Sequence, residues 1–93
     1  MEIEDPRLRS LLRQADRVTE SGKRAAAEQL YRQIIDEAPE VAEAWYGLGR
    51  VTAVPTDQEA AYEKAVTLKP DYAPAVRALA ELRGMGGEAL TAI

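Results

Sequence analysis

The chain has 93 residues and a net charge of −4, and 46% of its residues are hydrophobic, which fits one soluble globular domain. The absence of Cys and His from the composition argues against a disulfide framework, a thiolate zinc site and a nucleophile activated by either residue. No dense Lys/Arg block is present and no apolar run is long enough to cross a membrane, so neither nucleic-acid binding nor membrane insertion is expected. The acidic N-terminus lacks the apolar stretch of a signal peptide, so we expect a cytoplasmic protein. From the composition we expect neither a cofactor nor a metal.

Two helices are predicted in the first part of the chain. Asp5-Pro6 is typical of an N-cap followed by proline at the first helical position, so the first helix is expected over about 6–20. A Ser-Gly pair then predicts a turn. The second helix is expected over about 23–37 and is ended by Pro39, because proline lacks the amide donor and disfavours helical backbone in the preceding residue.

The next two helices depend on the residues around Pro55. The third helix is expected over about 41–54, with Pro55 ending it. Thr56, followed three residues later by Glu59, matches a capping box. The fourth helix is therefore expected to begin after this threonine and to end at Leu68.

The last predicted helix covers about 72–83. A glycine-rich run over 84–87 is expected to end it and to leave a flexible tail or a short helix. Connections of two to four residues require neighbouring helices to be antiparallel. The expected fold class is therefore all-α: two helix–turn–helix units, a closing helix and a short tail.

The sequence repeats itself, first with an offset of 34 residues and then of 31. The pairs at 34 are Leu11–Trp45 and Ala15–Gly49, and those at 31 include Tyr31–Tyr62, Pro39–Pro70, Leu48–Leu79 and Gly49–Ala80. Three residues are therefore missing once, around 54–58. We expect this to shorten the fourth helix by almost one turn, and Ala60 or Ala61 to shift into a position that needs a small residue.

The run Ala44-Trp45-Tyr46-Gly47-Leu48-Gly49 resembles the opening of a tetratricopeptide repeat, whose signature continues with Ala, an aromatic residue and Pro. The resemblance implies a solenoid of stacked helical hairpins. Its divisions would be a lead-in over 1–7, one repeat over 8–41, a shortened second repeat over 42–72, a capping helix over 73–83 and the tail over 84–93.

In that family the first helix of each repeat lines a concave groove that binds a partner protein or peptide. The resemblance therefore implies a protein–protein interaction module, an adaptor or scaffold, and not an enzyme. The groove candidates are Arg9, Leu12, Arg13 and Asp16, then Glu43, Tyr46, Arg50 and Ala53, then Pro74, Arg77 and Glu81. The arginines are expected to form a shallow basic strip suited to carboxylates, and Tyr46 to anchor a partner side chain.

These residues can also be interpreted without any binding function. The groove candidates are equally compatible with ordinary solvated helix residues, and Trp45 with a packing residue rather than a ligand platform. A subset of the family clamps the C-terminal carboxylate of chaperone peptides with Lys and Asn. The corresponding positions here hold Leu12, Asp16, Gly47, Pro74 and Ala78, so that activity is not expected.

A second function class follows from the incomplete repeat. Two and a half repeats are fewer than a stable solenoid normally needs. Apolar residues near the end of the chain, Leu79, Leu82, Leu90 and Ile93, would leave an apolar surface there. The alternative is therefore a structural subunit that forms a homo-oligomer or docks permanently in a larger complex. A third possibility is a regulatory domain of a longer enzyme.

Overall fold

The computed structural model describes residues 5–91, with side chains described up to Gly84, and this part of the chain forms five α-helices and no strand. The helices are α1 (Pro6–Glu20), α2 (Arg24–Glu37), α3 (Ala42–Val51), α4 (Pro55–Leu68) and α5 (Ala73–Thr91). The all-α fold class with five helices is confirmed. Over the described residues, no helix is both long and apolar enough to cross a membrane.

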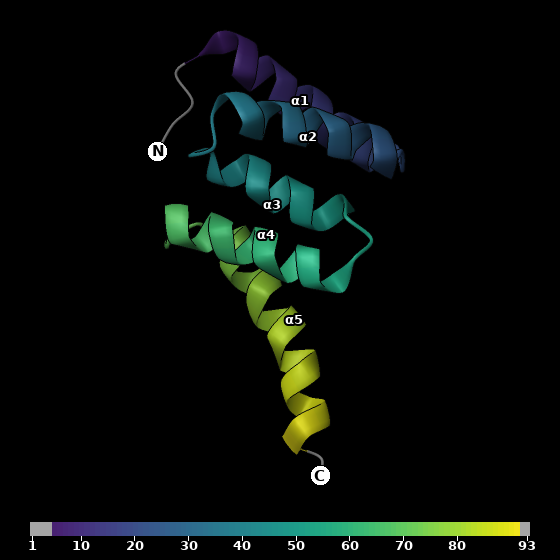
Figure 1. Cartoon of the computed structure of the whole chain (residues 1–93), viewed down its shortest axis with the longest axis vertical. Helices are drawn as coiled ribbons and strands as arrows, with labels where there is room; N and C mark the ends of the chain where they lie inside the picture. The colour runs from purple at the N-terminus through teal and green to yellow at the C-terminus, as the bar shows by residue number, and fades with distance from the viewer. Residues whose placement is uncertain (1–4, 92–93) are drawn as a thin grey trace.

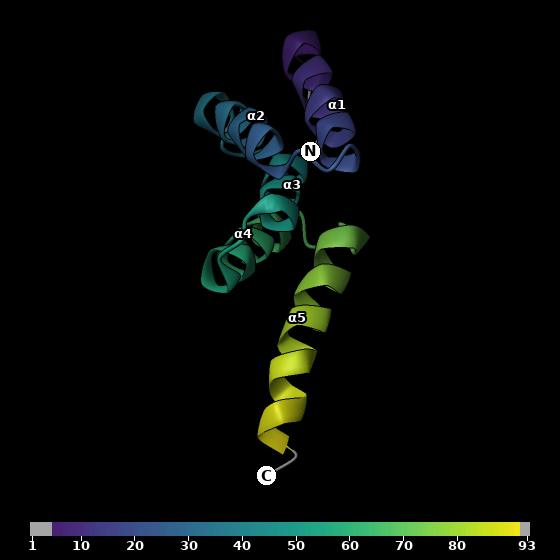
Figure 2. The same cartoon turned by 90° about the vertical axis from the view of Figure 1, so that its right-hand side faces the viewer.

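Each helix packs against the next one along the chain, and α1 also contacts α3. Figure 1 shows α1 to α4 stacked in a row, with α5 leaving the row at a steep angle. Figure 2 shows α2 and α4 on one side of α3, and α1 and α5 on the other. Helix α3 is therefore central, and the odd-numbered helices share one side of the molecule.

The first two helices begin and end close to where the sequence predicts. The amide of Arg7 donates to Asp5 Oδ1 at 2.9 Å, so Asp5 caps α1, and Pro6 occupies the first helical position. Gly22 has a φ of 83° in the turn after α1, a left-handed conformation that glycine adopts without steric cost.

The predicted capping box at Thr56 is wrong. Val54 is the N-cap residue of α4, no side chain caps this end, and Pro55 begins α4 instead of ending α3. Proline fits the first turn of a helix because the amide it lacks would have no helical partner there. It also favours extended backbone in the preceding residue, and Val54 has a φ of −92° and a ψ of 117°.

The second repeat is three residues shorter than the first because α3 ends early, and not because α4 is short. Helices α2 and α4 both have 14 residues, and adding 31 to the bounds of α2 gives the bounds of α4. Helix α3 has 10 residues against 15 in α1 and ends at Val51. The expected shortening of α4 is therefore wrong, and so is the expected shift of Ala60 or Ala61.

Without that shift, Gln58 occupies the position that corresponds to the buried Ala27. Because α3 ends early, the carbonyl of Gly49 lacks the amide donor that a continuing helix would supply. Gln58 Nε2 donates to this carbonyl oxygen at 2.9 Å. A side chain of α4 thus supplies the hydrogen-bond donor that a further turn of α3 would provide to the Gly49 carbonyl.

The glycine-rich run does not end the last helix, which the sequence predicts to stop at Arg83. Helix α5 continues through these glycines to Thr91. Glycine lowers helix propensity by about 1 kcal/mol per residue but, unlike proline, does not clash with the preceding turn. The predicted apolar end at Leu90 and Ile93 lies outside the residues whose side chains are described.

Trp45 connects the two groups of buried residues. One group lies mainly between α1, α2 and α3, and the other joins α3, α4 and the start of α5. The half-buried ring of Trp45 packs against both, and its Nε1 donates to the Pro39 carbonyl oxygen at 2.8 Å. These contacts support the interpretation of Trp45 as a packing residue.

Two tyrosine rings lie directly on the backbone of α3. A Cβ atom added at Gly47 would overlap the ring of Tyr31, and one added at Gly49 would overlap the ring of Tyr62. The two tyrosines correspond at the offset of 31, and both are buried. Glycine at these two positions therefore lets α2 and α4 approach α3 closely.

Replacing Gly47 by Ala should lower the free energy of unfolding by about 2 kcal/mol, because the buried Tyr31 ring must move. Gly84→Ala is the matched control, since a Cβ there meets no atom within 4 Å and alanine is the better helix former. That variant should gain about 0.5–1 kcal/mol. Urea unfolding followed by circular dichroism measures both, and equal effects would contradict the overlap.

Replacing Gln58 by Met keeps the length of the side chain but removes the donor to Gly49. We expect a loss of about 1 kcal/mol in the free energy of unfolding. Gln29→Met changes an exposed position of α2 and should stay within about 0.5 kcal/mol. If the two variants unfold at the same urea concentration, the bond does not stabilise the end of α3.

Candidate functional site

Three tyrosines, from α3, α4 and the connection before α5, meet beside α3. The ring centroid of Tyr46 lies 5.8 Å from that of Tyr62 and 5.7 Å from that of Tyr72, the second in an edge-to-face arrangement. We call these three residues the tyrosine cluster. The guanidinium carbon of Arg50 lies 5.7 Å from the centroid of Tyr46, within the range of a cation–π contact.

Sequence reasoning identified Tyr46 as a possible anchor but missed its neighbours. In the sequence, Tyr62 is only the repeat partner of Tyr31, and Tyr72 stands outside the repeat signature. The two neighbours come from α4 and from the connection before α5, 16 and 26 residues from Tyr46. Helical spacing along one element does not reveal such contacts.

Lys69 and Glu43 border the tyrosine cluster on one side. Lys69 Nζ lies 3.5 Å from Glu43 Oε2 and 5.3 Å from the ring centroid of Tyr72. The other carboxylate oxygen of Glu43 is buried and accepts no hydrogen bond from the described residues. Glu43, predicted as a free groove residue, is therefore held in place by an ion pair.

Asp16 accepts a hydrogen bond from the hydroxyl of Tyr31, which also lies 3.3 Å from Thr19 Oγ1. Burial of the ring and this bond both raise the pKa of Tyr31 well above its usual value. The same tyrosine that packs on Gly47 thus fixes the carboxylate of Asp16 at the edge of the groove.

Arg50 is exposed, and in the register of the repeat its position is occupied by an acid in the helices before and after it. At the offsets of 34 and 31 it corresponds to Asp16 and Glu81. The pKa of Tyr62 is raised mainly by burial, and it also responds to the charges of Arg50 and Glu81. The positive charge of Arg50 also acts to lower the pKa of Tyr31, whose hydroxyl donates to Asp16.

The other predicted groove residues lie at other levels. Arg9, Arg13 and Arg77 are exposed, and the repeat places Arg9 level with Glu43 and Arg77 level with Tyr46. Leu12 is half-buried and packs against the core, whereas Ala53 and Pro74 are exposed. In the register of the repeat, the four arginines occupy four different positions of their helices, and the basic strip stays a prediction.

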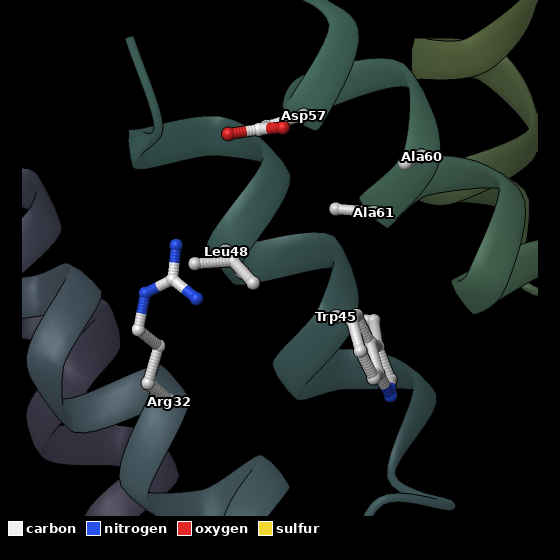
Figure 3. Close-up of a pocket in the computed structure, with 6 residues that line it drawn as sticks. All are labelled: Arg32, Trp45, Leu48, Asp57, Ala60 and Ala61. Carbon is white, nitrogen blue, oxygen red and sulfur yellow. The ribbon is translucent and has the colours of Figure 1, made fainter. Parts of the chain in front are cut away.

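A pocket of about 240 Å³ lies on the other side of α3, between α2 and α4 (Figure 3). It is lined by Arg32, Trp45, Leu48, Asp57, Ala60 and Ala61. Ala61 corresponds to Leu30 at the offset of 31, so a small side chain lines this pocket at a position where the first repeat has a leucine. Sequence reasoning missed this pocket, although the change from leucine to alanine was visible.

The polar rim of the pocket is partly engaged within the chain. Arg32 Nε and Nη2 bind Glu28 Oε2 at 3.0 and 2.9 Å. Figure 3 shows Arg32 and Asp57 at the rim and the small side chain of Ala61 pointing inward. The pocket offers mainly an apolar surface of the size of one side chain.

The fold is an all-α chain of successively packed helices, in which the half-buried Tyr46 and the exposed Arg50 of α3 lie beside the rings of Tyr62 and Tyr72. Among the described residues, no group of three or more acidic side chains is arranged to hold a metal ion. Comparison of the chain with protein-family models, with curated proteins and with solved structures finds no match.

Tyr72 should remain protonated far above the usual tyrosine pKa of 10. Burial, followed by the nearby charge of Glu43, raises its pKa to about 12. Because the unfolded chain loses this proton first, stability from this residue is complete below pH 10 and is lost as the pH rises through 12.

Absorbance titrations at 295 nm of the parent chain and of the Tyr72→Phe variant would test the raised pKa of Tyr72. Their difference curve should have a midpoint at about pH 12. The parent should also lose more stability than the variant between pH 10 and 12. A difference curve centred at pH 10 would show that the hydroxyl is not buried in the folded chain.

Proposed function

We propose that this chain is a protein-interaction module of the tetratricopeptide type that binds a segment of a partner protein. The binding surface is the side of α3 on which α1 and α5 lie, opposite to α2 and α4 (Figure 2). The observation that carries the proposal is the tyrosine cluster with the exposed guanidinium of Arg50 beside it. The internal repeat and the packing of successive helices support the family assignment.

The tyrosine cluster suits binding because its rings are already ordered. Tyrosine and arginine are enriched among residues that contribute most to protein–protein affinity. Tyr46 is half-buried and is held by its contacts with Tyr62 and Tyr72. A partner that covers it therefore loses little further side-chain entropy on the protein's side.

The same surface supports binding rather than catalysis. The carboxylate of Asp16 accepts from Tyr31, and that of Glu43 pairs with Lys69. Both acids are thereby engaged in fixing the groove. A general base needs a carboxylate within reach of a nucleophile that a substrate can approach. The hydroxyl bound to Asp16 belongs to the buried Tyr31, whose raised pKa makes it a poor nucleophile, and Glu43 pairs with a cation.

An alternative is assembly through α5, either with a second copy or within a larger complex. Val76 of α5 stands at the position that corresponds to Trp45, yet 41% of its surface is exposed. Arg83 of α5 pairs with Glu59 and Glu63 of α4, which fixes the direction in which α5 leaves the row. An exposed apolar residue at a packing position favours a covering partner.

A pull-down from the native cell with mass spectrometry provides a partner whose affinity can then be measured with purified proteins. Tyr46→Ala together with Arg50→Ala should weaken binding at least tenfold, because both side chains leave the groove. Arg24→Ala with Lys64→Ala, at exposed positions of α2 and α4, is the matched control and should bind as the parent does.

Circular dichroism must first show that both variants fold. Unchanged affinity of the Tyr46/Arg50 variant would remove the groove from consideration. Light scattering on the same samples separates the alternative, since a monomer at high concentration counts against self-assembly through α5.

A further inference from the structure

We propose that the pocket between α2 and α4 binds a free amino acid with an apolar side chain of about the size of leucine. This site goes beyond the proposed function, because the proposed partner surface is the side of α3 on which α1 and α5 lie (Figure 2). Two observations carry the inference. The pocket has a mainly apolar lining, and one basic and one acidic side chain stand at its rim (Figure 3).

The apolar lining comes from two helices. Trp45 and Leu48 of α3 and Ala60 and Ala61 of α4 line the pocket, and the side chain of Ala61 points inward (Figure 3). The volume is about 240 Å³, whereas pockets for drug-sized ligands have volumes of about 300–1,000 Å³. The pocket therefore suits a smaller molecule, such as a single amino acid whose apolar side chain lies against the indole ring.

The two charged groups at the rim can both be reached by an occupant. Asp57 is exposed in the first turn of α4 and pairs with no cation among the described residues. Arg32 is exposed on α2 and binds Glu28 through Nε and Nη2, and its Nη1 donates to no group in the described part of the chain. The rim therefore offers one acceptor group and one donor group to a ligand.

The charges around the pocket sum to zero, which favours a zwitterion. The positive charges are Arg32 and Lys64, whose Nζ lies 6.0 Å from the ring centroid of Trp45, and the negative charges are Glu28 and Asp57. A ligand with a net charge is attracted by one charge at the rim and repelled by the other. A free amino acid is attracted by both, because its carboxylate can face Arg32 while its ammonium faces Asp57.

Trp45 is the only tryptophan of the chain, so its emission reports directly on the pocket. The probe is L-leucine, which should change this emission saturably at low salt, with a dissociation constant of about 1 mM for so small a ligand. Its analogue 3-methylbutylamine lacks the carboxylate, and 4-methylpentanoate lacks the ammonium. Each should bind about fivefold more weakly, because one charge at the rim loses its counterpart.

The Asp57→Asn variant tests whether this carboxylate faces the ammonium. It should bind leucine about fivefold more weakly than the parent chain does. It should bind 4-methylpentanoate no more weakly, because that analogue has no ammonium to lose a contact. Asp71→Asn is the matched control, since it removes an exposed carboxylate between α4 and α5 and should leave the affinity for leucine unchanged.

The Ala61→Leu variant should fill the pocket from within. It introduces the residue that the first repeat has at the corresponding position, Leu30. Leucine at ten times the dissociation constant of the parent should then leave the tryptophan emission unchanged. Circular dichroism verifies that each variant folds, and Asp57→Asn keeps the test intact if Ala61→Leu does not, because Asp57 is exposed.

No saturable change with leucine, equal affinity for leucine and either analogue, or unchanged leucine affinity of the Asp57→Asn variant would each overturn this inference. N-acetyl-leucinamide has the same side chain but neither charge. If it binds as tightly as leucine, the pocket takes a residue within a partner chain, and the assignment to a free amino acid is wrong. The proposed function has a separate readout, because the Tyr46/Arg50 variant is measured against the natural partner.

Discussion

The structure depends on the close contact between two tyrosine rings and the backbone of α3. Tyr31 lies on Gly47 and Tyr62 lies on Gly49, so a helix approaches α3 closely at each of these glycines. Neighbouring helices that approach this closely exclude water from both rings, which is why small residues rather than large ones build much of the core.

The same contacts connect the core to the groove. The buried ring of Tyr31 ends in a hydroxyl that binds Asp16, and the ring of Tyr62 reaches the edge of Tyr46. Side chains that stabilise the fold therefore also set the positions of charges at the surface. Arg50 is held at the surface by its contact with the ring of Tyr46, which itself contacts Tyr62 and Tyr72.

The sequence predicted the number of helices and the bounds of the first two, because Asp5-Pro6 favours the start of a helix and Gly22 allows the left-handed turn that follows it. It failed near Pro55, since proline fits both the residue after a helix and the first turn of the next one. The predicted end of the last helix at the glycine run was also wrong, because glycine lowers helix stability too little to prevent α5 from continuing.

The candidate site was less predictable than the fold. Spacing along one helix identified Tyr46, but the contact with Tyr72 depends on how three helices and a connection are arranged in space. The hydrogen bond from Gln58 to Gly49 likewise depends on which of the two helices is shorter. The offset between the repeats shows that three residues are missing but not from which helix. Long-range pairs of this kind need the tertiary structure.

The linear order of packing has a consequence for folding and opening. Nearly every helix contact joins neighbours in the chain, so contact order is low and rapid folding is expected. Helix α3 has partners on both sides, whereas α1 and α5 close the two ends of the row (Figure 1). Local opening should therefore begin at either end and remove one wall of the groove while α3 stays protected from amide exchange. A bound segment that contacts all three walls would slow this opening at both ends at once.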